Sequence, residues 1–283
     1  MRKFILIVFA IVYIYSCKKE CNNYPHNLFK GKLKTIQDDM IGNRDSFIPT
    51  FYLFYDSITG QLKQVNVGGI LNGRDTIGTW INIVHDNIGN IYIKGYIKDG
   101  KFAKIKTVGK QITGIYLVDT TTYDEEQITN VLIKNNAADT IYDAGYVSVY
   151  ASDIINYNFV YTNNNCTSYT TEWIQSITGF PVNKRIDYQI YYSNLPNKNV
   201  LKYQDPVGFG KPCSFIGFLN FLNLDGYYLI QPNHNLIDSV VQSADIKQRY
   251  YYEFDADNNI KTVKINNING INSEDRFQYM TYY

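Results

Sequence analysis

Hydrophobic and polar residues alternate with a period of two along most of this chain. The clearest examples are three units in which an alternating segment, a turn rich in Asp, Asn and Gly, and a second alternating segment follow one another, at residues 50–67, 79–97 and 250–265. Such alternation is typical of strands, and these turn residues accept the backbone angles of tight hairpins. The pattern predicts an all-β domain of antiparallel hairpins, forming a strongly curved sheet or a barrel.

Shorter alternating segments extend this prediction along the chain. We expect further strands at residues 29–36, 101–108, 114–118, 130–134, 141–150, 156–161, 186–192, 227–231 and 276–282. Helical periodicity is rare by comparison. Its best example is Ser214–Leu222, where apolar residues recur at i, i+3, i+4 and i+7 after a serine that can cap a helix. With a second, shorter candidate at Trp173–Ile177, one or two short helices are expected.

The first sixteen residues differ from everything that follows. Arg2 and Lys3 precede an unbroken apolar run from Phe4 to Tyr15. This run has the length of the hydrophobic part of a signal peptide and is shorter than a membrane-spanning helix. We therefore predict an export signal at 1–16, a polar tether at 17–27 and the antiparallel β domain at 28–283. A plain secretory signal and an uncleaved hydrophobic anchor are the alternatives.

The signal ends in Ile14-Tyr15-Ser16-Cys17, which resembles the lipobox of bacterial lipoproteins. The resemblance implies that a diacylglycerol is joined to the Cys17 thiol and that the signal is cut before this residue. Two or three acyl chains would give lasting attachment to a membrane. Lys18 stands where such proteins carry Asp when the inner membrane retains them, so the implied location is the outer membrane. Residues 18–20 weakly resemble the export tag of surface-exposed lipoproteins.

The charge and the aromatic content narrow the choice of partners. Loss of Arg2 and Lys3 with the signal would change the formal net charge from +1 to −1, which excludes a strongly basic nucleic-acid surface. The chain has 27 tyrosines, several of them consecutive, and consecutive residues of a strand point to opposite faces. Tyr191, Tyr227 and Tyr251 are therefore candidates for an outward aromatic ligand surface. If both faces of the sheet are buried, they are core residues instead.

The cysteines and histidines show no metal-binding spacing. Besides Cys17, the chain has Cys21 in the tether and two cysteines in the predicted domain. In an oxidising compartment, a Cys166–Cys213 disulfide is the expected pairing. The three histidines are His26, His85 and His234, and their scatter gives a Ser–His–Asp site little support. We predict no cofactor.

Two weaker kinds of chemistry are considered for the carboxylates. Asp255, Asp257 and Asn259 place oxygen ligands at alternate positions, as calcium loops do, but the glycine and the closing glutamate of such a loop are missing. Glycoside hydrolysis requires two carboxylates at a fixed separation. The available residues are Glu126, Glu172, Asp187, Asp205 and Glu253. No pair among them is distinguished by the sequence, so no catalytic residue is predicted.

The two Asp-containing units at 54–65 and 253–263 resemble the repeats of tyrosine/aspartate-rich bacterial surface proteins. The whole layout, from lipobox and tether through hairpins and a short apolar helix to a last hairpin, is similar to a set of uncharacterised bacterial lipoproteins with a porin-like fold and no known function. The resemblance implies a curved or closed antiparallel barrel. Because Lys and Asp recur on alternate strand faces, we expect a barrel without the apolar outer band of lipid-embedded barrels.

These observations favour a non-enzymatic envelope lipoprotein, a binding or scaffolding module whose partner is a glycan or another envelope protein. A surface glycan-processing enzyme of the glycoside hydrolase type is the first alternative. A lipid or lipoprotein carrier built on a half-barrel is the second.

Overall fold

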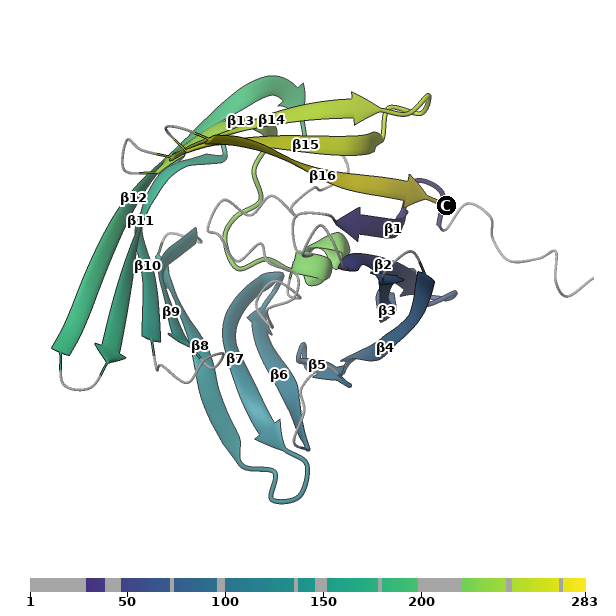
Figure 1. Ribbon diagram of the computed structural model, residues 1–283. Coiled ribbons are helices and arrows are strands. Elements are labelled where there is room, and N and C mark those ends of the chain that lie inside the picture. Colours follow the sequence, from purple (N-terminus) through teal and green to yellow (C-terminus); the bar gives the residue numbers. More distant parts are fainter. Residues whose placement is uncertain are drawn as a thin grey trace, which may run out of the picture.

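The strands close into a barrel (Figure 1). The computed structural model describes residues 29–38, 47–71, 74–95, 100–134, 137–145, 152–177, 180–197, 220–242, 246–269 and 272–283. In this part of the chain every strand pairs antiparallel with its neighbours in sequence, and β1 pairs with β16 to complete the ring. The prediction of an all-β antiparallel domain is confirmed, and the sheet is closed. It is therefore not the half-barrel of the carrier hypothesis.

The strands have the following bounds: β1 Leu33–Asp38, β2 Phe47–Tyr55, β3 Leu62–Leu71, β4 Arg74–His85, β5 Ile91–Lys94, β6 Lys101–Val108, β7 Gln111–Asp119, β8 Glu125–Lys134, β9 Ala137–Gly145, β10 Ser152–Thr162, β11 Asn165–Ile177, β12 Phe180–Pro196, β13 Asn235–Gln242, β14 Ile246–Phe254, β15 Ile260–Asn269 and β16 Asn272–Tyr282.

The alternation in the sequence sorts side chains between the inside and the outside of the barrel. In β2, Phe51 and Leu53 are buried, whereas Tyr52 and Phe54 between them are exposed. The ring of Phe51 lies 5.1 Å from that of Phe221, a residue of the short 3-10 helix η1. Figure 1 shows η1 inside the ring of strands, so the buried face is the lumen side. The apolar core formed by the described residues therefore lies on the inner side of the barrel wall.

Three hairpin turns at one end of the barrel repeat the same polar arrangement. Asp56, Asp86 and Asp255 each follow a strand, and each accepts hydrogen bonds from backbone N–H groups two to four residues further on. These bonds lower the pKa of the Asp56 and Asp255 carboxyls. Burial opposes ionisation of Asp86, but bonds from Asn90, Ile88 and Tyr92 outweigh it and lower its pKa to about 2. The aspartates therefore stabilise the turns that the sequence predicted.

Three local predictions need correction or lie partly outside the described residues. Trp173–Ile177 belongs to β11 and is not helical, because it pairs with β12 along its whole length. Residues 227–231 form no strand; Tyr228 makes an isolated bridge to Gln111. The expected helix at 214–222 overlaps η1, Asn220–Asp225, and its part before residue 220 is outside the described chain. Among the described residues, no helix has the length and apolar character needed to span a membrane.

Candidate functional site

The described part of the connection between β12 and β13 lies inside the ring of strands near one end (Figure 1). We call residues 220–235, which end at the first residue of β13, the plug. Phe221 and Leu222 of η1 are fully buried. Further along, Tyr228 donates its N–H to the Lys110 carbonyl and accepts the N–H of Ile112, at 3.0 and 2.8 Å. Apolar packing and backbone pairing thus attach the plug to the wall near the β6–β7 turn.

Gln111 strengthens this attachment from the wall. Its side-chain nitrogen lies 2.6 Å from the carbonyl oxygen of Leu229 and 3.2 Å from that of Tyr228. On the other side of the plug, the Cys166 N–H donates to Asn233 at 3.0 Å, and the Asn235 N–H donates to the side-chain oxygen of Asn165 at 2.9 Å. The plug is therefore bonded to two separate parts of the ring, at the start of β7 and at the start of β11.

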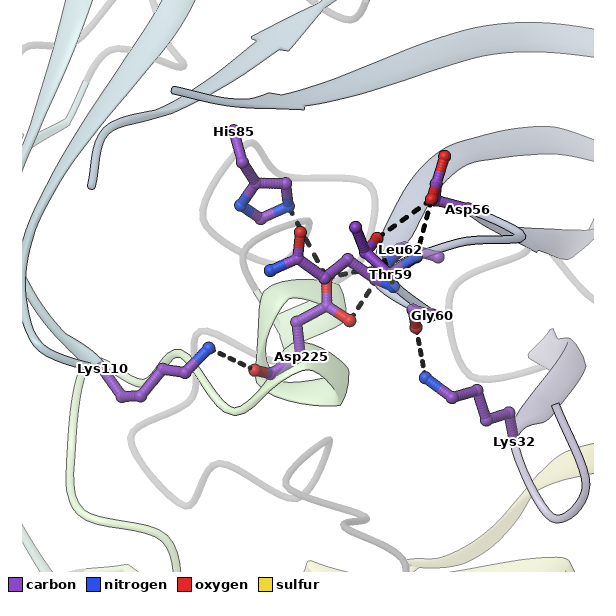
Figure 2. A network of polar contacts seen from close by, with 9 residues as sticks. Lys32, Asp56, Thr59, Gly60, Leu62, His85, Lys110 and Asp225 are labelled. Atoms are coloured by element: carbon purple, nitrogen blue, oxygen red, sulfur yellow. Dashed lines mark hydrogen bonds and ion pairs between the residues drawn. The ribbon is translucent and has the colours of Figure 1, made fainter. Parts of the chain in front are cut away.

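Asp225 makes a further polar contact between plug and wall (Figure 2). Its side chain is 2% exposed, and both carboxylate oxygens accept the Leu62 N–H, at 2.9 and 2.8 Å. Lys110 donates to the Asp225 backbone carbonyl at 3.0 Å, and Lys32 donates to the carbonyl of Gly60 in the neighbouring turn. Because Leu62 begins β3, this carboxylate joins η1 to the β2–β3 hairpin.

His85 lies beside this carboxylate at the end of β4. Its Nε2 is 3.7 Å from Asp225 Oδ2, and its ring stacks on Tyr227 with 5.7 Å between centroids. Burial lowers the pKa of His85, and the charge of Asp225 opposes this shift. Neither ring nitrogen makes a hydrogen bond within the described structure. No described hydroxyl or thiol is thus held by His85 for activation as a nucleophile.

The electrostatics of this cluster are those of a structural contact. Burial raises the pKa of the Asp225 carboxyl, while the Leu62 N–H, His85, Lys32 and Lys110 favour its ionised form. Burial, and then the charge of Asp225, raise the pKa of Tyr55, whose hydroxyl donates to the Leu33 carbonyl at 2.9 Å. Asp225 and Lys110 bond the plug to the wall, and His85 packs beside the carboxylate. The cluster therefore acts as a latch, and we call Asp225, His85 and Lys110 the plug latch.

The carboxylates considered for glycoside hydrolysis are not assembled in the lumen. Glu126 lies opposite Leu117 in the register of β7 and β8, and it is half exposed and pairs with Lys101 at 3.7 Å. Glu172 and Asp187 lie on the adjacent strands β11 and β12, where Asp187 accepts the Thr170 hydroxyl at 2.8 Å and pairs with Arg185. The Thr170 hydrogen bond, followed by Arg185, lowers the pKa of Asp187, opposite to the shift that a general acid requires.

The remaining carboxylates give no alternative pair. Glu253 is exposed on β14, and Asp205 lies outside the described residues. The weak calcium candidates occupy the β14–β15 turn, where Asp255 accepts the Asp257 and Asn259 N–H groups and the Asn259 side chain. Within the described chain, no group of three or more His, Cys, Asp or Glu residues is arranged to hold a metal ion. The turn thus has the hairpin geometry that the sequence also allowed.

The three predicted surface tyrosines separate into two locations. Tyr191 and Tyr251 are half exposed on the outer face of β12 and β14. Tyr227 is buried in the plug between His85 and the Lys110 ammonium, which is 3.9 Å from the ring centroid. Tyr227 therefore cannot join an outer surface with the other two. The prediction for it was wrong because residues 227–231 do not form a strand.

The predictions for the cysteines lie mostly outside the described structure. Cys17, Cys21 and Cys213 belong to segments that are not described, so lipidation and the Cys166–Cys213 disulfide stay predictions. Cys166 itself is fully buried in β11. Of the histidines, His26 is not described and His234 is exposed in the plug.

Comparison with known proteins identifies the shape of the barrel. No family model and no curated protein matches the chain. Among solved structures, a porin-like protein from Bacteroides uniformis has 13% sequence identity and a TM-score of 0.58, over 90% of this chain and 99% of its own. A porin-like protein from Bacteroides vulgatus has 12% identity and a TM-score of 0.55, over 89% and 99%. This chain has a porin-like barrel fold. At these identities the likeness concerns the fold alone.

The plug latch was missed by sequence reasoning, although a signal for it exists. Asp225 is the only charged residue in the apolar segment Phe221–Ile230 and is followed by Gly226. A carboxylate in such a segment requires a buried partner. His85 gave no signal, because its position at the end of a hairpin strand is equally suited to a solvent-exposed residue.

Proposed function

We propose that this chain is a lipid-anchored outer-membrane protein whose porin-like barrel is a closed, non-catalytic binding or scaffolding module. One observation carries the proposal: polar and apolar side chains are distributed in the opposite way to those of a pore. A water-filled porin has a polar lumen and an apolar outer band. Here the lumen side carries the apolar core and one end holds the plug. We therefore expect the barrel not to conduct ions or solutes.

The outer face supports the same proposal. Ion pairs lie along its strands, including Lys104–Glu125 at 2.6 Å on β6 and β8 and Lys264–Asp275 at 2.9 Å on β15 and β16. Charged side chains in the lipid-facing band of a barrel are destabilising. The outer face of this barrel is therefore suited to water, and membrane attachment would depend on the acyl chains at Cys17.

The position of the tether follows from the start of the described chain. The Phe29 ring packs against Tyr55 and Tyr283, and the Gly31 N–H donates to the Tyr283 carbonyl. These contacts lie at the plugged end, where Lys32 reaches Gly60. A lipid at Cys17 would therefore hold the plugged end towards the membrane and leave the outer wall of the barrel accessible.

Replacing the anchor residue tests this proposal. In cells that export the protein, we expect wild-type chain in the outer-membrane fraction and Cys17→Ala in the soluble periplasmic fraction. A Cys21→Ala variant is the matched control and should stay membrane-bound. Purified wild-type protein should give no solute flux in liposome swelling and no cleavage of glycans or peptides. Retention of Cys17→Ala after carbonate washing, solute flux or substrate turnover would each contradict the proposal.

A further inference from the structure

An exposed aromatic surface lies on the outer face of β2, β3 and β4. Tyr52 and Phe54 of β2 and Trp80 of β4 are 42%, 39% and 47% exposed, and the rings of Phe54 and Trp80 are 5.4 Å apart. Large aromatic rings that remain exposed together on one face often mark a binding surface. We call these three rings, with the amide side chains between them on β3 and β4, the aromatic–amide face.

Asn66 is at the centre of this face. It is directly opposite Tyr52 on one side and Trp80 on the other, so the two rings flank it across neighbouring strands. Its outward direction follows from Val65, which is fully buried on the lumen side. Asn66 is 8% exposed, so its amide lies at the floor of the face, between the two rings. An amide at this position offers a ligand both a hydrogen-bond donor and an acceptor.

A second pair of amides adjoins Asn66. Gln64 Nε2 donates to Asn82 Oδ1 at 2.8 Å across β3 and β4, in the row of the sheet that also contains Phe54. This bond uses one polar atom of each side chain. Gln64 keeps its carbonyl oxygen and Asn82 its NH₂ group for another partner. Donors and acceptors therefore alternate beside the flat rings.

We infer that the aromatic–amide face binds a neutral oligosaccharide. Hexopyranose rings present flat C–H faces, which pack on aromatic rings, and hydroxyls, which both donate to and accept from amides. Two strand spacings, about 10 Å, separate the Tyr52 and Trp80 positions, which allows adjacent sugar residues to contact both rings. None of the six residues is charged, so a neutral sugar fits better than an acidic one. The inference rests on the proposed function, because the face is accessible only if the barrel wall is outside the lipid.

Calorimetric titration of the full lipidated chain tests the inference. The protein would be held in a detergent without a sugar headgroup and titrated with cellohexaose, maltohexaose, mannohexaose, an oligogalacturonate and a proline-rich decapeptide. We expect at least one neutral hexaose to bind. Trp80→Ala should weaken that binding about tenfold or more, as loss of a central aromatic contact does. Asn66→Ala should weaken it about fivefold through the lost hydrogen bond.

Tyr191→Ala is the matched control, since it removes a similarly exposed ring from β12 on another part of the wall. It should leave the affinity unchanged. Binding of the decapeptide or oligogalacturonate alone, equal affinity of wild type and Trp80→Ala, or no binding by any probe would each overturn the inference. None of those outcomes would change the expected release of Cys17→Ala from the membrane, so the proposed function would still stand. Cleavage of a bound hexaose would instead overturn the non-catalytic function and leave the binding surface in place.

Discussion

Polar side chains have different surroundings on the two faces of strands β2–β4. At the lumen side, the buried Asp225 carboxylate accepts the Leu62 N–H with both oxygens and has His85 beside it. On the outer face, the Asn66 amide lies between the exposed rings of Tyr52 and Trp80 and is 8% exposed. The Asp225 carboxylate is bound by groups of the same chain and attaches the plug. The rings of the outer face remain exposed, so they are available to an external partner. Contacts made within the chain thus separate a structural contact from a candidate binding surface in the same strands.

The largest effect is expected from breaking the latch. Asp225→Ala leaves the buried Leu62 N–H without an acceptor, and we expect a loss of about 3 kcal/mol in the free energy of unfolding. Urea denaturation measures this loss. Hydrogen exchange should show faster exchange at residues 220–235 than in β14 and β15.

Asp238→Ala is a control for the latch variant, because Asp238 is an exposed residue of β13. Its stability should stay within about 0.5 kcal/mol of wild type, as for ordinary surface substitutions. An Asp225→Ala protein as stable as the Asp238→Ala control would show that the plug is held by its apolar contacts alone.

A smaller effect of opposite sign is expected on the outer face. Asn66→Val replaces a polar residue that strands disfavour by one that they favour, so the free energy of unfolding should rise by about 1 kcal/mol. The same variant should lose hexaose binding. Gln64→Val is the comparison, because it breaks the bond to Asn82 and should not stabilise the protein. A destabilised Asn66→Val would indicate that the amide already has a partner.

The smallest effect is a dependence on pH that belongs to the latch. The folded-state pKa of Asp225 is raised above 3.8 by burial, so the folded protein gains stability relative to the unfolded chain as this carboxyl takes up a proton. Asp225→Asn lacks this gain, and it also lacks the charge that raises the pKa of His85. The stability of wild type relative to Asp225→Asn should therefore increase as the pH falls from 7 towards 4.

Denaturation of both proteins at pH 7, 5 and 4 measures this difference. The turn aspartates, whose pKa values are lowered, lose their stabilising effect in acid, but they do so equally in both proteins. A difference that stays constant or shrinks on acidification would contradict the burial of Asp225.

The strands were predictable because each carries its own alternation, as Phe51 and Leu53 against Tyr52 and Phe54 illustrate. The turns were predictable because their aspartates act locally. The plug was not predictable. Tyr227–Gln231 has the composition of a strand, and only its contacts with residues far away in the sequence, such as that of Gln111 with Tyr228, hold it in another conformation. The aromatic–amide face was missed for a related reason. It depends on the register of β2, β3 and β4, which places Asn66 between two rings.

The pairing of β1 with β16 has a consequence for the order of assembly. The Thr35 and Thr281 hydroxyls meet at 2.7 Å across 246 positions of sequence, so the ring cannot close before nearly the whole described chain has been synthesised. Until then, β1 presents an unpaired edge, which invites aggregation. The plug precedes β14, β15 and β16 in the chain and can dock on β3 and β7 while the wall is still open. Pairings this distant make folding slow. A chain of this design would depend on chaperones for longer than a barrel closed by local contacts.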